Sequence, residues 1–335
     1  MKTPGEPPEL VGQSPAFIDA LAHASAAAAI DRPLLICGER GSGKELIAGR
    51  IHFLSPRWEG PFIKLNCAAL SDELLDSELF GHEAGAFTGA TRRHAGRFER
   101  AEGGTLFLDE IASASGRIQE KLLRVIEYGE YERVGGAETR IADVRIIAAA
   151  NADLPSLARE GKFRADLLDR LAFDVIAAPP LRERKDDIPL LAAHFASGMA
   201  REISAPFPGF SPDAMAALMA HAWPGNVREL KNAAERSFHR WATAGDGGPI
   251  DAVVIDPFPN PISEPLEQAA PQERTAVGAP FDLRDRLNEL EKRWTKEALA
   301  ESGGNQKEAA ARLSLTYDQL RGLMRKHKLA ASKRN

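Results

Sequence analysis

The sequence predicts an α/β protein in three parts: a parallel-sheet domain, a smaller helical domain packed on it, and a C-terminal helical unit. Three observations favour this arrangement. Short apolar runs alternate with helical patterns over residues 10–178, which is typical of a parallel sheet. After Pro179 and Pro180 the periodicity becomes helical throughout. Residues 244–280 carry many prolines and glycines with little periodicity, which predicts a flexible, extended linker.

The predicted elements set the expected domain limits. The candidate strands are residues 34–37, 62–65, 105–108 and 144–150. The candidate helices of the second domain are residues 188–203, 212–222 and 226–243. We therefore expect a sheet domain over residues 10–178, a helical lid over 179–243, a linker over 244–280 and a terminal helical domain over 281–335.

Composition places the chain among ordinary globular proteins. Its 335 residues, 44% of them hydrophobic and 27% charged, are enough for about two domains with sizeable cores. No uncharged apolar run approaches the roughly 20 residues of a membrane helix, and the N-terminus does not look like a signal peptide. Cys37 and Cys67 both lie in apolar segments, so neither a disulfide framework nor a metal cluster is expected. These features favour the reducing cytoplasm.

The net charge of −5 is unevenly distributed. Residues 281–335 hold 13 lysines and arginines against 8 acidic residues, whereas the remainder of the chain holds 30 against 40. A small basic unit on an acidic body indicates that the tail, rather than the body, binds nucleic acid.

A glycine-rich turn follows the first candidate strand and opens a helical pattern. Its residues are Gly38, Glu39, Arg40, Gly41, Ser42, Gly43, Lys44 and Glu45. The glycines let consecutive N–H groups point at an anion, the following helix adds its dipole, and Lys44 supplies a positive charge for the outer phosphates. The strand–turn–helix setting favours a phosphate loop for ATP over an ordinary turn with a surface lysine. Glu45 stands where such loops usually place the Ser or Thr that contacts Mg²⁺.

Two acidic residues end the candidate strand that follows about sixty residues after this turn. Asp109 is expected to hold Mg²⁺ on the nucleotide, and Glu110 to polarise the attacking water. A solvated acidic turn is the alternative interpretation, but the phosphate loop upstream favours an ATPase. Asn66, just past another candidate strand, is either a partner of Glu110 or an ordinary turn residue.

Three arginines are candidates for contact with nucleotide phosphates. Arg164 and Arg170 are candidates to act from a neighbouring subunit, where such a cation accelerates phosphoryl transfer about 10³- to 10⁵-fold. The local alternative is a helical ion pair between Asp166 and Arg170, worth about 0.3–0.5 kcal/mol. Arg228 opens a lid helix and is expected to reach the nucleotide, and here too the sequence leaves a purely local role open.

The basic tail has the pattern of a helix-turn-helix. Asn305 and Gln306 can cap a helix that runs through Leu313, and residues 314–316 form the turn before a second basic helix. The residues expected to meet DNA are Thr316, Tyr317, Asp318, Arg321, Arg325 and Lys326. The alternative is a small helical domain with a solvated basic face. Leu283, Leu287, Leu290 and Trp294 form an apolar stripe that would serve as core or as a dimer surface.

Several of these stretches together carry a family likeness. Residues 38–45, 104–110, 163–170 and 223–230 resemble the AAA+ domain of bacterial enhancer-binding proteins, which activate sigma-54 RNA polymerase. The most specific stretch is 78–90, whose last six residues spell GAFTGA. The likeness covers roughly residues 10–243, and the tail resembles the Fis-type module of the same family.

The GAFTGA residues are Gly85, Ala86, Phe87, Thr88, Gly89 and Ala90. The glycines allow a tight, mobile turn, and an aromatic displayed at its tip is costly unless it binds a partner. From the residues alone, the favoured interpretation is that Phe87 folds into the core. The resemblance implies that this loop contacts sigma-54.

The resemblance also assigns roles to the other candidate residues. It implies Lys44 and the loop backbone on phosphates, Asp109 on Mg²⁺, Glu110 as catalytic base, and Asn66 as the switch that links Glu110 to the GAFTGA loop. It further implies Arg164 and Arg170 as fingers in trans and Arg228 as a nucleotide sensor. The family usually has Thr-Asn at the end of the sensor strand, where this chain has Ala150 and Asn151, so only Asn151 is retained as a candidate.

The resemblance implies a transcription activator that forms a homo-oligomeric ring, a hexamer, and hydrolyses ATP to open a sigma-54 promoter. Residues 57–62 and 122–136 are similar to the branch of the family that acts in the phage shock stress response. That branch lacks an N-terminal receiver or sensor domain, as expected here because few residues precede Leu10. An inhibitory partner, phage shock protein A, would then supply the regulation, with Trp58 either as its contact or as a core residue.

Two rival functions remain at the level of sequence. An AAA+ chaperone or unfoldase subunit would be expected to have a pore-loop aromatic and no DNA-binding tail. A DNA-binding repressor with a degenerate ATPase fold would not need Lys44, Asp109 and Glu110 intact.

Overall fold

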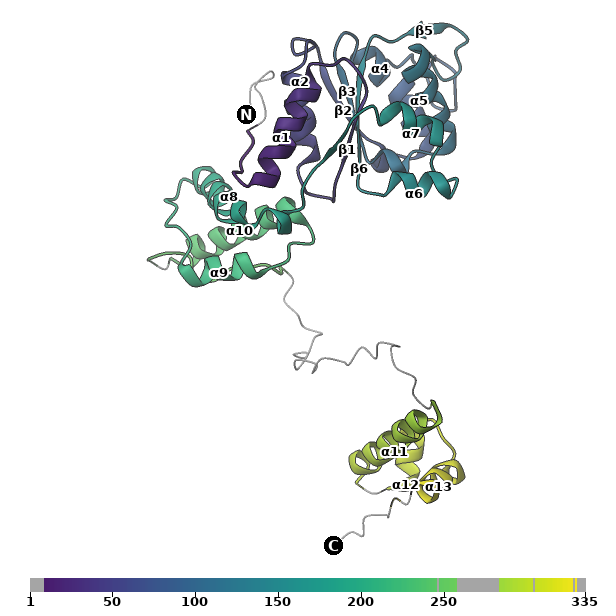
Figure 1. Ribbon diagram of the computed structural model, residues 1–335, viewed down its shortest axis with the longest axis vertical. Coiled ribbons are helices and arrows are strands. Elements are labelled where there is room, and N and C mark those ends of the chain that lie inside the picture. Colours follow the sequence, from purple (N-terminus) through teal and green to yellow (C-terminus); the bar gives the residue numbers. More distant parts are fainter. Residues whose placement is uncertain (1–8, 246, 258–282, 304, 328, 330–335) are drawn as a thin grey trace. The chain divides into compact units, whose positions relative to one another are not determined.

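The computed structural model describes residues 9–245, 247–257, 283–303, 305–327 and 329. The chain divides into two compact units, residues 1–259 and 260–335 (Figure 1). Residues 258–280 of the expected linker lie outside the described residues. No described helix has both the length and the apolar character needed to cross a membrane.

A five-stranded parallel sheet forms the centre of the first unit, with strand order β2-β3-β6-β1-β7. The strands are β1 (Leu34–Cys37), β2 (Phe62–Asn66), β3 (Thr105–Asp109), β6 (Arg145–Ala150) and β7 (Val175–Ala177). Cys37 pairs with Ala150, and Asn66 pairs with Asp109. The register therefore brings the carboxyl ends of β1, β2, β3 and β6 to one edge of the sheet, where the phosphate loop begins.

Helices cover both faces of the sheet, as expected for an α/β domain. Figure 1 shows α1 and α2 on one face and α5, α6 and α7 on the other. Their bounds are α1 (Pro15–Ala28), α2 (Lys44–Phe53), α3 (Asp72–Phe80), α4 (Arg97–Arg100), α5 (Gly116–Tyr128), α6 (Leu154–Arg159) and α7 (Ala165–Leu171). Leu34 and Ile36 join one apolar core and Leu35 joins the other, which is the period of two that a strand requires.

The lid contains α8 (Ile188–Glu202), α9 (Pro212–Ala220) and α10 (Asn226–Ala244). Trp223 is fully buried in its core, and its Nε1 donates a hydrogen bond to the carbonyl oxygen of Leu218 at 2.9 Å. Residues 249–256 fall in the linker expected from the sequence, yet Ile250 is buried against the lid and its N–H bonds to Gly209. The lid therefore continues past residue 243.

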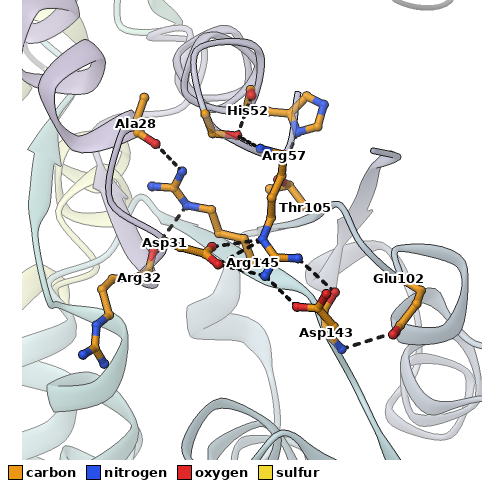
Figure 2. Close-up of polar contacts among 10 residues, drawn as sticks. Ala28, Asp31, Arg32, His52, Arg57, Glu102, Thr105, Asp143 and Arg145 are labelled. Carbon is orange, nitrogen blue, oxygen red and sulfur yellow. Dashed lines mark hydrogen bonds and ion pairs between the residues drawn. The ribbon is translucent and has the colours of Figure 1, made fainter. Parts of the chain in front are cut away.

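A polar network ties together the amino ends of the strands (Figure 2). Arg145, buried at the start of β6, donates to the carbonyl oxygens of Ala27 and Ala28 at 2.9 and 2.8 Å, which holds the end of α1. Arg57 pairs with Asp31 at 2.8 Å and with Asp143 at 2.6 Å. This clamp fixes the turn after α2 against two strand starts.

The described part of the second unit contains the helices α11 (Leu283–Glu301), α12 (Gln306–Arg312) and α13 (Tyr317–Lys326). Its core residues are Ala298, Ala309, Ala310, Leu320 and Met324. Leu287 and Trp294 are about half exposed within this unit, so they are not part of its core. The side chain of Leu283, from the same expected stripe, lies outside the described residues.

Two tryptophans of the first unit, Trp223, which is buried, and Trp58, which is exposed, test its packing. We expect Trp223→Ala to lower the free energy of unfolding by about 3–5 kcal/mol, because it leaves a cavity in the lid core and an unpaired carbonyl. Trp58→Ala is the matched control: its side chain is 55% exposed, and we expect a change within about 0.5 kcal/mol. Urea unfolding followed by circular dichroism measures both. Equal losses for the two variants would contradict this description of the lid core.

Candidate functional site

The glycine-rich turn after β1 has the backbone of a phosphate loop. Gly41 and Gly43 have φ angles of +75° and +104°, which side-chain-bearing residues rarely adopt. A Cβ on Gly41 would also lie 2.3 Å from the carbonyl oxygen of Gly225 in the lid. The first turn of α2 follows directly, so its unpaired N–H groups face the loop. Both glycines are therefore required by the geometry.

Lys44 is buried at the start of α2, with its amine turned into the loop. Nζ donates to the carbonyl oxygens of Gly38 at 2.9 Å and Glu39 at 3.2 Å. Burial lowers the pKa of Lys44, and the carboxylates of Glu110 and Asp109 oppose this shift. The loop thus carries a desolvated cation whose backbone partners a phosphate oxygen can replace.

The two acids at the end of β3 occupy different positions. Asp109 Oδ1 accepts a hydrogen bond from the backbone N–H of Glu110 at 3.0 Å. Glu110 has a φ of +54°, a strained conformation that is common at functional sites, and its side chain is 9% exposed. Its nearest cation is Arg40, with Nε 3.5 Å from Oε1. Asn66 lies beside Asp109 in the sheet register, but its Oδ1 accepts from the N–H of Ala68 at 2.9 Å.

Two adjoining hollows form a cleft between the sheet domain and the lid. The larger, about 470 Å³, contains Arg40, Lys44, Asp109, Glu110 and Arg228. The smaller, about 70 Å³, has a mostly apolar lining; its apolar residues are Leu10, Val11, Phe17, Leu46, Leu191, Phe195 and Val227. Gly43, Leu46, Phe195 and Val227 line both hollows. One end thus suits phosphates and the other suits a flat base, which matches a nucleotide.

The apolar hollow was not found from the sequence, because its walls come from segments far apart in the chain. Asp187, fully buried, accepts hydrogen bonds from the backbone N–H groups of Gln13 and Ser14 at 2.6 and 2.8 Å. Arg184, also buried, donates to the carbonyl oxygen of Ser42 at 3.0 Å and lies over the Phe17 ring. These contacts hold the N-terminal segment and the lid around the same space.

A latch made by Asn226, Glu39 and Arg182 joins the lid to the phosphate loop. Asn226 is fully buried: its Oδ1 accepts from the N–H of Leu181 at 2.7 Å, and its Nδ2 donates to Glu39 Oε2 and to the Arg40 carbonyl, both at 3.0 Å. Arg182 pairs with Glu39 at 2.7 Å. The hydrogen bonds from Arg182 and Asn226 lower the pKa of Glu39 to about 2. Sequence reasoning placed Glu39 in the loop but found neither partner.

The remaining candidate arginines and Asn151 lie outside this cleft. Arg164 pairs with Asp166 at 2.7 Å, and Arg170 pairs with Glu127 of α5 at 2.6 Å. The local alternative, an Asp166–Arg170 pair, is therefore wrong, because both groups have other partners. Asn151 is exposed just past β6. Of the described residues that line the cleft, none is Arg164, Arg170 or Asn151.

The GAFTGA segment forms a tight turn on a braced stem. Gly85 and Gly89 have φ angles of +82° and +101°, and the Gly85 N–H bonds to the Ala90 carbonyl at 2.7 Å. Phe87 is 44% exposed, with one edge of its ring against His82. Ala86 packs so closely on Gly135 that a Cβ added to Gly135 would lie 2.6 Å from the Cβ of Ala86. The loop therefore displays Phe87 and rests on the turn of the hairpin formed by β4 (Glu130–Glu132) and β5 (Thr139–Ile141).

The stem of this turn is held by charges. Arg133, buried, pairs with Glu83 at 2.7 Å and also with Glu99. His82 bridges to both His94 and Val134. The GAFTGA turn and the neighbouring hairpin thus share one set of contacts.

The C-terminal unit has the helix-turn-helix geometry. The Thr316 hydroxyl accepts from the N–H of Gln319 at 3.3 Å, and Gln319 Oε1 accepts from the N–H of Thr316 at 2.8 Å, which is a capping box at the start of α13. Tyr317, Asp318, Arg321 and Arg325 are exposed along α13. Lys326 pairs with Glu291 of α11 at 2.6 Å. Thr316 and Lys326 therefore have structural contacts besides the expected DNA contacts.

Comparison with known proteins defines the class. Residues 10–177 match the Sigma-54 interaction domain family, residues 182–253 match the AAA+ ATPase lid domain, and residues 286–327 match the Fis family of bacterial regulatory proteins. The chain belongs to the sigma-54-dependent transcriptional activators, with an AAA+ nucleotide-binding ATPase domain and a DNA-binding helix-turn-helix. The expected fold class is confirmed.

Individual relatives sharpen this assignment. The chain is 56% identical to the Psp operon transcriptional activator of Escherichia coli, over 96% of this chain and 98% of that protein. It is 44% identical to the Nif-specific regulatory protein of Azotobacter vinelandii, over 93% of this chain but only 57% of that protein. Among solved structures, NtrX from Brucella abortus in complex with ATP is similar, with a TM-score of 0.69, 33% identity, and coverage of 96% of this chain and 70% of that one.

The latch predicts a specific dependence of stability on pH. A carboxylate whose pKa is depressed on folding stabilises the folded state fully above its unfolded value, here 4.5, and loses this contribution as the pH falls toward about 2. We therefore expect Glu39→Gln to be less stable than wild type at pH 6, with a gap that narrows below about pH 4.5. Urea unfolding midpoints between pH 6 and pH 3 test this, with Glu202→Gln, an exposed acid of the lid, as control. A gap that stays constant over this range would contradict the assignment.

Proposed function

We propose that this activator assembles as a hexameric ring, hydrolyses ATP at subunit junctions, and uses the energy to convert a closed sigma-54 promoter complex into an open one. The observation that carries the proposal is the cleft that brings Lys44, Asp109, Glu110 and Arg228 together. The exposed Phe87 turn in the same domain is the proposed contact through which hydrolysis acts on sigma-54.

Within the cleft each residue has a distinct role. Lys44, the loop N–H groups and Arg228 bind the phosphates, which Lys44 reaches by exchanging its two carbonyl partners for phosphate oxygens. Glu110 orients the attacking water and accepts its proton. Mg²⁺ fits beside Asp109, because one carboxylate together with nucleotide phosphates and water is its usual ligand set. When bound, it would neutralise charge on the phosphates.

The ring proposal rests on the placement of two arginines. Arg164 and Arg170 are exposed and lie outside the cleft of their own chain, each held by an acid that a phosphate could replace. A cation presented in this way can stabilise the transition state in a neighbouring subunit's cleft. Asn151, past the end of β6, is proposed to sense the nucleotide bound in its own chain.

Movement of the GAFTGA turn is proposed to couple hydrolysis to the polymerase. Asn66 lies next to Asp109 in the sheet and relays the state of Glu110 toward the turn, where Phe87 and Thr88 contact sigma-54. The charged stem around Arg133 makes the turn a two-position element that the γ-phosphate biases.

The DNA and regulatory roles follow the same logic. Tyr317, Asp318 and Arg321, on the first turns of α13, are proposed to read bases of an enhancer, while Arg325 and Lys326 contact phosphates. The likeness to the Psp operon activator supports a role in the phage shock response in the cytoplasm, with phage shock protein A as inhibitor. Trp58, exposed on the turn beside Arg57, is its proposed contact.

Two variants separate ATP hydrolysis from open-complex formation. We expect Lys44→Ala to abolish ATP hydrolysis and open-complex formation, because the phosphates lose their buried cation. Thr88→Ala should retain hydrolysis within about two-fold but lose open-complex formation at least ten-fold, because only the contact with sigma-54 changes. Phosphate release and permanganate footprinting on a sigma-54 promoter measure the two activities. Normal promoter opening by the Thr88 variant would refute the role of this turn.

The inhibitor contact is tested separately. Trp58→Ala should weaken binding of purified phage shock protein A by about ten-fold or more, because a large exposed aromatic typically dominates such a contact. Basal ATP hydrolysis should be unchanged, since Trp58 precedes the amino end of β2 and does not line the cleft. Pull-down titration and phosphate release provide the readouts. Loss of both binding and hydrolysis would instead mean that Trp58 supports the fold.

A further inference from the structure

The Glu110 carboxylate rests beside a cation that the proposed mechanism does not use. Arg40 Nε lies 3.5 Å from Glu110 Oε1, and no other ion pair to Glu110 is found among the described residues. The Glu110 side chain is 9% exposed, whereas that of Arg40 is 69% exposed. Arg40 therefore reaches from the open side of the cleft to a nearly buried base.

The backbone of Arg40 is fixed while its side chain remains able to move. Its carbonyl oxygen accepts a hydrogen bond from Asn226 Nδ2 at 3.0 Å. On either side, Glu39 is paired with Arg182, and the Gly41 carbonyl accepts from the N–H of Val227 at 3.0 Å. The guanidinium is thus an exposed positive charge on a fixed backbone, and it lines the same hollow as Lys44 and Arg228.

A γ-phosphate bound at Lys44 would compete with Glu110 for this guanidinium. Arginine binds phosphate through two parallel charge-assisted hydrogen bonds, whereas an ion pair with an exposed partner contributes little. The contact with Glu110 is also longer than a hydrogen bond. The resting pair can therefore be displaced by a nucleotide that carries the third phosphate.

We propose that Arg40 is a positioning residue that holds Glu110 in a resting orientation until a γ-phosphate draws the guanidinium away. The released carboxylate then turns to the attacking water, so the base becomes available only when there is a bond to hydrolyse. Asn66 does not hold Glu110 in the resting state: among the described residues its one side-chain hydrogen bond is the one that Oδ1 accepts from the N–H of Ala68, and none joins its amide to Glu110. This inference rests on the proposed role of Glu110 as catalytic base.

A double-mutant cycle on the full chain measures this exchange through binding. Dissociation constants for a non-hydrolysable ATP analogue and for ADP are determined for wild type, Glu110→Gln, Arg40→Gln and the double variant. Glu110→Gln removes repulsion of the γ-phosphate in either background, but it frees a held guanidinium only when Arg40 is present. We expect it to tighten analogue binding about 2- to 5-fold more in the Arg40 background, equal to about 0.4–1 kcal/mol of coupling.

Controls separate this exchange from general charge effects. Lys231→Gln removes an equal charge from the same hollow, and in that background Glu110→Gln should keep its full effect on analogue binding. For ADP, which lacks the γ-phosphate, Glu110→Gln should change the dissociation constant equally with and without Arg40. Equal tightening with and without Arg40, or an equal excess for ADP, would overturn the proposal for Arg40. Failure of the wild-type chain to bind the analogue or hydrolyse ATP would instead overturn the proposed function.

Discussion

The buried amide of Asn226 is the contact on which the arrangement of the ATPase domain depends. One side chain bonds to the backbone of the lid at Leu181, to the side chain of Glu39 and to the backbone of Arg40. Because the amide is fully buried, losing any partner would leave a polar group unsatisfied, at a cost of about 1–3 kcal/mol. The lid is thus locked onto the phosphate loop, and Arg228, two residues further along α10, is brought into the cleft.

The charges in the cleft suit an anion, and backbone carbonyl oxygens take the place of its oxygens beside Lys44. Lys44 is desolvated, and the carbonyl oxygens of Gly38 and Glu39 occupy positions that phosphate oxygens can take. Asp109 and Glu110 balance the cations on the opposite wall. Charges of both signs therefore line the same hollow without disturbing the apolar core.

The GAFTGA turn shows how an exposed element is supported without being buried. Phe87 keeps nearly half of its surface exposed and makes a T-shaped ring contact with His82, whereas the stem is fixed by the buried guanidinium of Arg133. An exposed tip thus stands on a fixed stem. Its two glycines supply backbone angles that other residues would adopt only with strain.

The sequence by itself determined the fold class, the central strands, the phosphate loop and the pair Asp109–Glu110, because these depend on local periodicity and on spacing within one segment. It missed β7, which is only three residues long, and the β4–β5 hairpin, whose residues carry no apolar alternation. Only the tertiary structure decided what meets across the cleft: the Glu39–Arg182 pair, the apolar base pocket and the contact of Arg40 with Glu110. The two ion pairs join residues 70 and 143 apart in the numbering, and no local pattern records which distant side chains the packing of lid and sheet brings together.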